Sequence, residues 1–425
     1  MDNAKQERQI QILKALGFLV ILFFFWLIFF PTKDEFLNVG PPEMKKIEIE
    51  DVKVVGYKKG KRTWEISAKY VWSPQSTDRA TLEYISNGNA YDNGRIVLMN
   101  LQASKVIANS NIEQLIAQDG VKAYLIRKNK NPNDLKERIL IWAKYMLYSG
   151  QAKKSQVQGS IRVQQKDAGV YGEKAEINHE EDTVTFEAPF KIIQKNIYLS
   201  AESLKTFLNK ERFVLKGKAQ IIRKKEKIST KNIDQREIFF KKDDLQIKAN
   251  LIDFSSADDK AKATLSGQIV VIQPGKNAFG DEGDYDEQLD FVELRKSKAG
   301  LKQAGLILDK TDWLLDEKTV EALKNPDTRE TFSKKTTILA DKIRMRIDDR
   351  DAFALGNVVV RQEGKLAYAD KAYYLEKDEN IRLKGQVRFQ QNDGTWLQAE
   401  EALVSLKNNT FEAVGEVETN IIIDK

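Results

Sequence analysis

The sequence predicts an all-β protein of stacked antiparallel strands, preceded by one N-terminal transmembrane helix. Three observations support this prediction: strict alternation of apolar and polar residues, recurrence of the alternating unit about every 29 residues, and an uncharged apolar run near Met1. Period-two alternation is typical of a strand with one buried and one wet face. A fixed repeat of this length indicates structural units that stack on their neighbours.

The clearest copy of the unit is Leu366–Phe389, with the sequence LAYADKAYYLEKDENIRLKGQVRF. Its second half alternates strictly from Ile381 to Phe389, whereas its first half changes phase after Ala369. A one-residue slip moves side chains to the other face of a sheet, so we expect a bulge or kink in this first strand.

The unit recurs with a small residue at the phase change and a second small residue further on. The first set is Ala143, Gly172, Ala201, Ala249, Ala340, Ala369 and Ala399. The second set is Gly159, Ala188, Gly217, Gly267, Gly356, Gly385 and Gly415. We expect the second set to leave room on the inner face of the stack.

Residues 1–31 predict a membrane anchor. The run from Ala15 to Phe30 carries no charge, and with Ile10, Ile12 and Leu13 the apolar span is about 20 residues, enough to cross a bilayer. No small-residue cleavage site follows, so we do not interpret this run as a removed signal peptide. Three cations precede it and favour a cytoplasmic N-terminus, with the bulk of the chain outside the cytoplasm.

The remaining chain divides by pattern into five segments. Residues 32–44 form a tether containing Gly40-Pro41-Pro42, residues 45–135 carry loose copies of the unit, residues 136–273 carry tight copies, and residues 336–425 carry the last three. Residues 274–335 break the pattern: 281–290 hold six acids, and Trp313–Lys324 predicts a capped helix. We expect 274–335 to be a mobile insertion outside the stack, its acids a solvated loop without calcium-ligand spacing.

Composition restricts the chemistry. The chain has 425 residues, a formal net charge of +6 and no cysteine, which excludes disulfides, thiolate catalysis and cysteine metal sites. No basic patch with interleaved aromatics is apparent, so we expect no nucleic-acid partner. The single histidine, His179, lies in the turn-like stretch NHEED, and we expect it to be solvated. We predict no enzyme activity, no catalytic residue, no metal and no cofactor.

Two walls of such strands, with neighbouring strands about 4.8 Å apart, make a sandwich or a trough. Inner side chains then either fill a closed core or leave an apolar slot, and alternation alone allows both.

Several stretches resemble one family. The anchor, the tether, VVGYKKGKRTWEISAKYVW and repeats such as LSAESLKTFLNKERFVLKGKAQII resemble the lipopolysaccharide-transport bridge proteins of the LptC and LptA (OstA-like) type. The resemblance covers nearly the whole chain except 274–335. It implies one or two slipped β-jelly rolls with an open apolar groove.

The resemblance also implies a function without bond-making. Such a protein, anchored in the inner membrane and exposed to the periplasm, receives lipopolysaccharide from an ABC transporter through its permease subunits. It passes the lipid toward the outer membrane, docking by a strand edge on a further jelly-roll bridge or outer-membrane component. The expected groove-lining residues are Phe186, Phe190, Leu215, Ile221, Ile269, Val358, Val387, Phe389 and Phe411.

Three alternatives stay open: a membrane-tethered β-solenoid scaffold, a carrier of another lipid such as phospholipid, and a carbohydrate-active β-helix enzyme. The enzyme would need carboxylates clustered on one face of successive strands. Acids such as Glu412, Glu416 and Glu418 instead lie on the wet face of the last predicted strand, Thr410–Ile423. We expect this strand to present an open edge.

Overall fold

The computed structural model describes residues 48–73, 79–128, 130–134, 138–165, 168–224, 244–256, 260–296, 303–308, 335–406 and 410–420. The chain divides into two compact units, 1–48 with 72–77, and 49–71 with 78–425. The first unit is almost entirely outside the described residues, as is the predicted anchor. The site and the surfaces discussed below all belong to the second unit.

All regular elements of the described residues are β-strands, as predicted. Fifteen of them are long: β1 (Glu48–Lys58), β2 (Lys61–Trp72), β3 (Arg79–Asp92), β4 (Arg95–Asn109), β5 (Gln114–Leu125), β6 (Ile139–Ser149), β7 (Lys154–Gln165), β8 (Ala168–Asn178), β13 (Arg212–Arg223), β14 (Leu245–Ser255), β15 (Lys262–Gln273), β16 (Lys276–Asp286), β21 (Ala352–Gln362), β22 (Lys365–Leu375) and β23 (Asn380–Gln391). The others are β9 (Thr183–Glu187), β10 (Phe190–Gln194), β11 (Ile197–Ser200), β12 (Ser203–Phe207), β17 (Phe291–Arg295), β18 (Ala304–Leu308), β19 (Thr336–Ala340), β20 (Lys342–Arg346), β24 (Trp396–Ser405), β25 (Thr410–Val414) and β26 (Glu418–Asn420).

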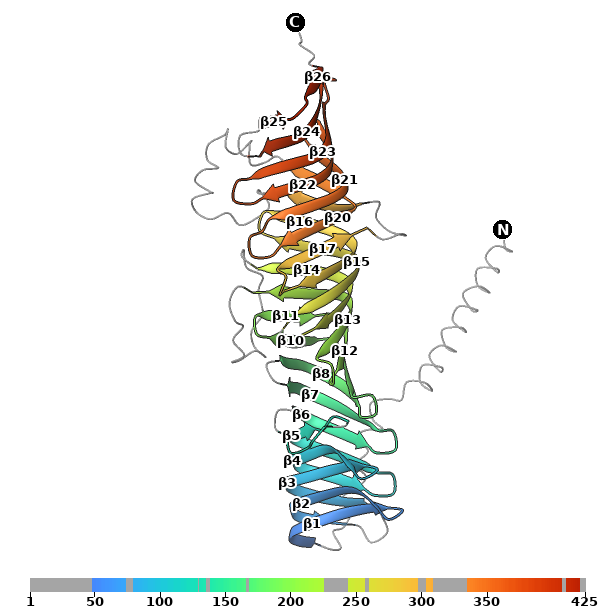
Figure 1. Cartoon of the computed structure of the whole chain (residues 1–425). Coiled ribbons are helices and arrows are strands. Elements are labelled where there is room, and N and C mark those ends of the chain that lie inside the picture. Colours follow the sequence, from blue (N-terminus) through green and yellow to red (C-terminus); the bar gives the residue numbers. More distant parts are fainter. Residues whose placement is uncertain are drawn as a thin grey trace, which may run out of the picture. The chain divides into compact units, whose positions relative to one another are not determined.

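The strands of the second unit follow one another in sequence order, from β1 to β26 (Figure 1). From β5 onward each long strand contributes to two walls. In β23, for example, Val387–Gln390 pair with the first half of β24 and Asn380–Lys384 with its second half. Among the other strands β24 also contributes to both walls, and the rest occupy one wall each: β9 and β12 pair in one wall, and β10 and β11 in the other. The first wall here means the one containing β10, and the second wall the one containing β9.

The phase change of the repeat is a bulge, as the sequence predicted, but its extra residue lies in the other strand of the unit. The register of β23 shifts against both β22 and β24 just after Lys384, around Gly385 and Gln386, which have φ angles of 79° and 44°. The same left-handed pair recurs at Gly159-Ser160, Gly217-Lys218, Gly267-Gln268 and Gly356-Asn357. Glycine is favoured there because other residues are strained at positive φ.

These glycines do not leave room on the inner face, so that expectation is wrong. A Cβ on Gly159 would lie 2.9 Å from Cβ of Lys144, and one on Gly267 would lie 2.9 Å from Nδ2 of Asn250. Both neighbours are exposed side chains at the bend. The glycines are therefore required because the backbone bends at positive φ there and because a neighbouring side chain on the outer surface packs closely against each of them.

The interpretation of 274–335 as an insertion outside the stack is wrong for its described part. Strands β16, β17 and β18 belong to the sheet, where β15 pairs with β16 and β18 pairs with β19. The acids of 281–290 lie largely on a strand, where Asp284 pairs with Arg295 at 2.6 Å and Asp286 with Lys262 at 2.8 Å. The predicted helix Trp313–Lys324 lies outside the described residues.

Both walls share one hydrophobic core. Inner residues of the first wall, such as Ile141, Ile247 and Val271, belong to the same buried cluster as Met146, Ile252 and Leu265 of the second wall. Strand pairing continues across the predicted boundaries, since β5 pairs with β6 and β15 with β16. The core is therefore continuous along the described strands.

Candidate functional site: the apolar interior and its C-terminal cavity

All nine predicted lining residues lie on the inner faces of the walls. The first wall holds Phe190, Ile221, Ile269, Val358, Val387 and Phe389, and the second wall holds Phe186, Leu215 and Phe411. Eight of them are buried in the common core, and Phe411 is partly buried against it. Alternation thus placed every one on the correct face.

The interior is packed along most of its length. The rings of Phe186 and Phe190, one from each wall, have centroids 6.5 Å apart. Phe186, Leu215 and Ile221 expose no surface at all. Side chains packed in this way are a closed core, and a slot would open here only if the walls separated.

A cavity lies beside the last inner residues of the stack. Its volume is about 190 Å³, and its apolar lining includes Phe389 and Phe411, whose ring centroids are 4.5 Å apart. The other apolar lining residues are Val360, Leu366, Ala367 and Val404. Polar side chains of Gln362, Lys365, Gln391 and Thr410 complete the lining.

This cavity can take a hydrocarbon segment. An apolar cavity of about 150 Å³ suffices to bind benzene in a protein core. The polar lining residues could meet the headgroup of an amphiphile whose chain contacts the two phenylalanines. Among the nine predicted residues, the structure therefore brings Phe389 and Phe411 to an accessible site and leaves the other seven in the packed core.

Polar contacts join the two walls at one side of the core. Lys276, at the start of β16, has a fully buried side chain, and its Nζ lies 2.9 Å from Oε2 of Glu376 and 5.2 Å from the Tyr374 ring centroid. Burial lowers the pKa of Lys276, and Glu376 opposes that shift. Similar long-range contacts join Arg223 to Asp348 at 3.0 Å and Arg127 to the carbonyl of Leu208 at 2.9 Å. These contacts between the walls are called the polar seam. The sequence did not predict the polar seam, because a lysine beside Pro274-Gly275 is typical of an exposed turn.

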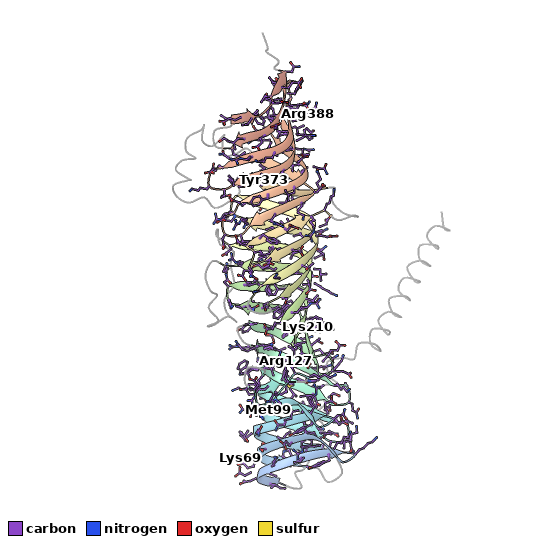
Figure 2. All side chains as sticks on the ribbon, in the orientation of Figure 1. Lys69, Met99, Arg127, Lys210, Tyr373 and Arg388 are labelled. Carbon is purple, nitrogen blue, oxygen red and sulfur yellow. The ribbon has the colours of Figure 1, made fainter. Side chains whose placement is uncertain are left out.

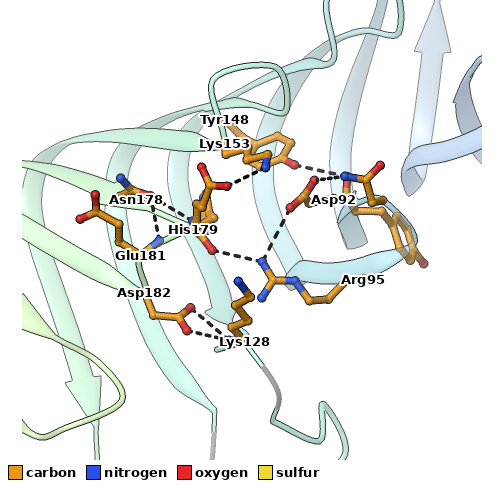
Figure 3. A network of polar contacts seen from close by, with 12 residues as sticks. Asp92, Arg95, Lys128, Tyr148, Lys153, Asn178, His179, Glu181 and Asp182 are labelled. Carbon is orange, nitrogen blue, oxygen red and sulfur yellow. Dashed lines mark hydrogen bonds and ion pairs between the residues drawn. The ribbon is translucent and has the colours of Figure 1, made fainter.

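His179 is buried, so the expectation of a solvated residue is wrong. It is 5% exposed, its Nε2 lies 2.8 Å from Oγ of Ser155, and its carbonyl accepts a hydrogen bond from Arg95 at 3.1 Å (Figure 3). Burial, assisted by Arg95, lowers the pKa of His179 to about 4. The ring also packs edge-on against Tyr148.

The Ser155–His179 pair has the spacing of a nucleophile and its base but no room for a substrate. Ser155 is fully buried, and the nearby carboxylate of Asp182 accepts hydrogen bonds from the Lys128 backbone at 2.9 Å and from Asn209 at 2.6 Å. Figure 3 shows the contact between Asp182 and Lys128, which joins the turn before β9 to the segment after β5. We therefore interpret the network as a structural tie between turns.

The described residues offer neither a metal site nor a membrane-spanning helix. No group of three or more histidines or carboxylates there is placed to hold a metal ion. No helix in this part of the chain is long and apolar enough to span a bilayer.

Comparison with known proteins finds likenesses among solved structures but none in sequence. No family model and no curated protein matches the chain. Among solved structures it is similar to LptH of Pseudomonas aeruginosa, described as the LptA-homologous periplasmic component of a lipopolysaccharide transport device. The two are 11% identical, the match covers 42% of this chain and 95% of that chain, and the TM-score is 0.23. A likeness with so low a TM-score does not bear on function, which rests on the residues.

Proposed function

We propose that this protein is a lipid carrier, and specifically a membrane-anchored periplasmic component of lipopolysaccharide export. It receives lipopolysaccharide from the permease subunits of an inner-membrane ABC transporter and passes it toward the outer membrane through the apolar interior of its β-stack. A further jelly-roll bridge or an outer-membrane component takes over the lipid at a strand edge. The carrier itself makes and breaks no bond.

The observation that carries this proposal is the cavity lined by Phe389 and Phe411, which borders a continuous apolar core. Each methylene group exposed to water costs about 0.8 kcal/mol, so acyl chains cross an aqueous space only under cover. A long two-walled sheet with one uninterrupted apolar interior can provide that cover. The lipopolysaccharide assignment rests on the sequence resemblance of the anchor, the tether and the repeats.

The second candidate is a membrane-tethered structural scaffold. It is favoured by the tight packing of the middle of the core, where Phe186 and Leu215 are fully buried. A scaffold needs no ligand and keeps its core filled, whereas a carrier must open the walls. Transport of another lipid, such as phospholipid, would use the same interior. Only the identity of the bound lipid distinguishes it from transport of lipopolysaccharide.

Photo-crosslinking in living cells tests the carrier. A photoreactive amino acid at Phe411, beside the cavity, should capture lipid, and mass spectrometry of the adduct should identify lipopolysaccharide. The matched control is the same amino acid at Arg382, which lies on the exposed outer face of the second wall. Equal capture at both positions, or capture at neither, would contradict the carrier and favour the scaffold.

A further inference from the structure

The outer face of the first wall differs from the rest of the surface in its charge. Two rows of residues cross this face, each made of cross-strand neighbours on successive strands. One row runs Lys122, Trp142, Arg162, Tyr171, Lys191, Ser200, Gln220, Lys248, Val270, Phe279, Gly305, Leu339, Val359, Tyr368, Arg388, Gln398 and Glu418. The other runs Tyr124, Leu140, Gln164, Gly169, Ile193, Tyr198, Ile222, Gln246, Ile272, Asn277, Ile307, Thr337, Arg361, Leu366, Gln390, Trp396 and Asn420. These two rows are called the basic face.

From β5 to β24 the basic face contains no carboxylate, although the chain has 63 acidic residues; its one carboxylate within the described residues is Glu418, at the end of the first row on β26. The outer face of the second wall carries both signs, with Asp253, Asp284, Glu293 and Glu401 among its acids. Beside the basic face, carboxylates return at the bends, where Glu202 pairs with Lys218 at 3.0 Å. The two walls therefore differ in the charge of their outer faces.

The cations of the basic face are not neutralised within the described residues. Lys122, Lys191, Lys248, Arg361 and Arg388 form no ion pair there, whereas on the second wall several cations, such as Arg212 and Lys384, take carboxylate partners and others do not. Figure 2 labels Arg388 on the basic face and Tyr373 on the second wall. Five unpaired cations without a carboxylate among them favour an anionic partner.

Between these cations the basic face is aromatic and aliphatic. Arg162 lies between two rings, with its guanidinium carbon 4.9 Å from the Trp142 centroid and 5.7 Å from that of Tyr171. An apolar stretch follows along the six strands from Val270 to Tyr368, and its ends are exposed: Val270 is 36% and Tyr368 is 41% exposed. A partner of this face must therefore accept apolar and aromatic contact as well as positive charge.

We propose that the basic face is a docking surface for an anionic membrane. Phospholipid headgroups supply phosphate for the lysines and arginines, whose stems lie along apolar surface. Tryptophan and tyrosine rings are suited to the headgroup region. From β5 to β24 the face presents no carboxylate to repel phosphate, which fits a laterally uniform anionic sheet. This surface lies outside the apolar interior, so the inference stands apart from the carrier proposal.

The absence of cysteine allows a direct test with the full chain in vesicles. A fluorophore is attached to Gln220→Cys on the basic face, or to Thr264→Cys on the second wall as control. Nitroxide-labelled lipid headgroups should quench the Gln220→Cys probe in vesicles that contain phosphatidylglycerol, and high salt should reverse the effect. Neither probe should be quenched in phosphatidylcholine alone.

Charge reversal supplies the matched variants. Lys248→Glu, Arg361→Glu and Arg388→Glu together should reduce the quenching at least about tenfold, because each cation near an anionic surface contributes to binding. The same net change on the second wall, Lys216→Glu, Lys371→Glu and Arg382→Glu, should leave it unchanged. All six residues are exposed, and circular dichroism checks that both variants fold.

Three outcomes would overturn the proposal. The first is equal quenching in phosphatidylcholine, and the second is equal loss in both triple variants. The third is binding to soluble polyglutamate, which mimics an acidic protein, without quenching in anionic vesicles. Retained quenching in a variant with a blocked interior, such as Ala367→Trp, is expected, because it separates the basic face from lipid carriage.

Discussion

His179 makes folding sensitive to acid through a single buried ring. Its pKa in the folded chain is lowered to about 4, whereas an unfolded histidine takes up a proton near its ordinary value of 6.5. The unfolded state therefore binds the proton first, so the stabilisation is complete above pH 6.5 and is lost as the pH falls toward 4. We expect the free energy of unfolding to fall by up to about 3 kcal/mol across this window.

Urea unfolding at a series of pH values measures this effect. Because the chain has no other histidine, His179→Gln should remove most of the loss between pH 6.5 and 5, while lowering stability at pH 8. A variant that keeps the wild-type slope in that window would show that His179 is not the titrating group.

Gly159 tests the bend of the repeat. Its φ of 78° strains any residue with a Cβ, and Lys144 packs against the position. Gly159→Ala should destabilise the chain by about 1–2 kcal/mol. Gly159→Asn adds the same Cβ but tolerates the left-handed region better, so it should cost less. Equal urea midpoints for alanine and wild type would contradict the requirement for positive φ.

At the scale of elements, the seam contact between β16 and the end of β22 is the strongest candidate for a tie between the walls. Glu376→Ala leaves the buried Lys276 without its carboxylate, and a buried unpaired charge costs about 3–5 kcal/mol. Because Glu376 is partly exposed, we expect a loss at the lower end of this range. Thermal or urea unfolding at neutral pH measures it.

The double variant Lys276→Met with Glu376→Leu is the control. Replacing both partners by apolar side chains leaves no buried charge, so it should be much closer to wild type than Glu376→Ala alone. If the double variant were the less stable of the two, the ion pair itself would be the stabilising element.

The strands could be predicted wherever apolar and polar residues alternate, because that pattern assigns side chains to faces. It placed Phe190 and Phe389 inside without any structure. It failed for β16, where Asp284 and Asp286 appear as a solvated loop until their cross-strand partners Arg295 and Lys262 are known. Whether the interior is closed at Phe186 and open at Phe411 also lay beyond the pattern, because alternation determines the face and not the distance between walls.

At the scale of the whole molecule, the described strands form a continuous ladder where the sequence predicted separate segments. Pairing passes from β5 to β6 and from β15 through β16 and β18 to β19 without interruption of the core. In such stacks each strand is stabilised mainly by its neighbours. A substitution at one end is therefore expected to act locally, which makes the last strands suitable for testing edge contacts.

The predicted last strand, Thr410–Ile423, is two short strands up to Asn420, and residues 421–425 lie outside the described part. Within the described residues, β25 and β26 pair only with β24. The other edge of β25 can therefore receive a strand from a further copy or from a bridge partner. Val417 lies between the two strands, so a proline there does not interrupt pairing.

Proline in β25 tests this edge. Successive amide groups of a strand point to opposite sides, so Glu412 and Ala413 donate to opposite edges of β25. A proline at one of these positions removes a donor from the open edge, and a proline at the other removes a donor to β24. The first should weaken self-association or pull-down of a bridge partner about fivefold, the effect of one backbone hydrogen bond, without loss of stability. The second should lower stability locally, and Val417→Pro should do neither. If all three variants associate like wild type in sedimentation and pull-down experiments, β25 is not the docking edge.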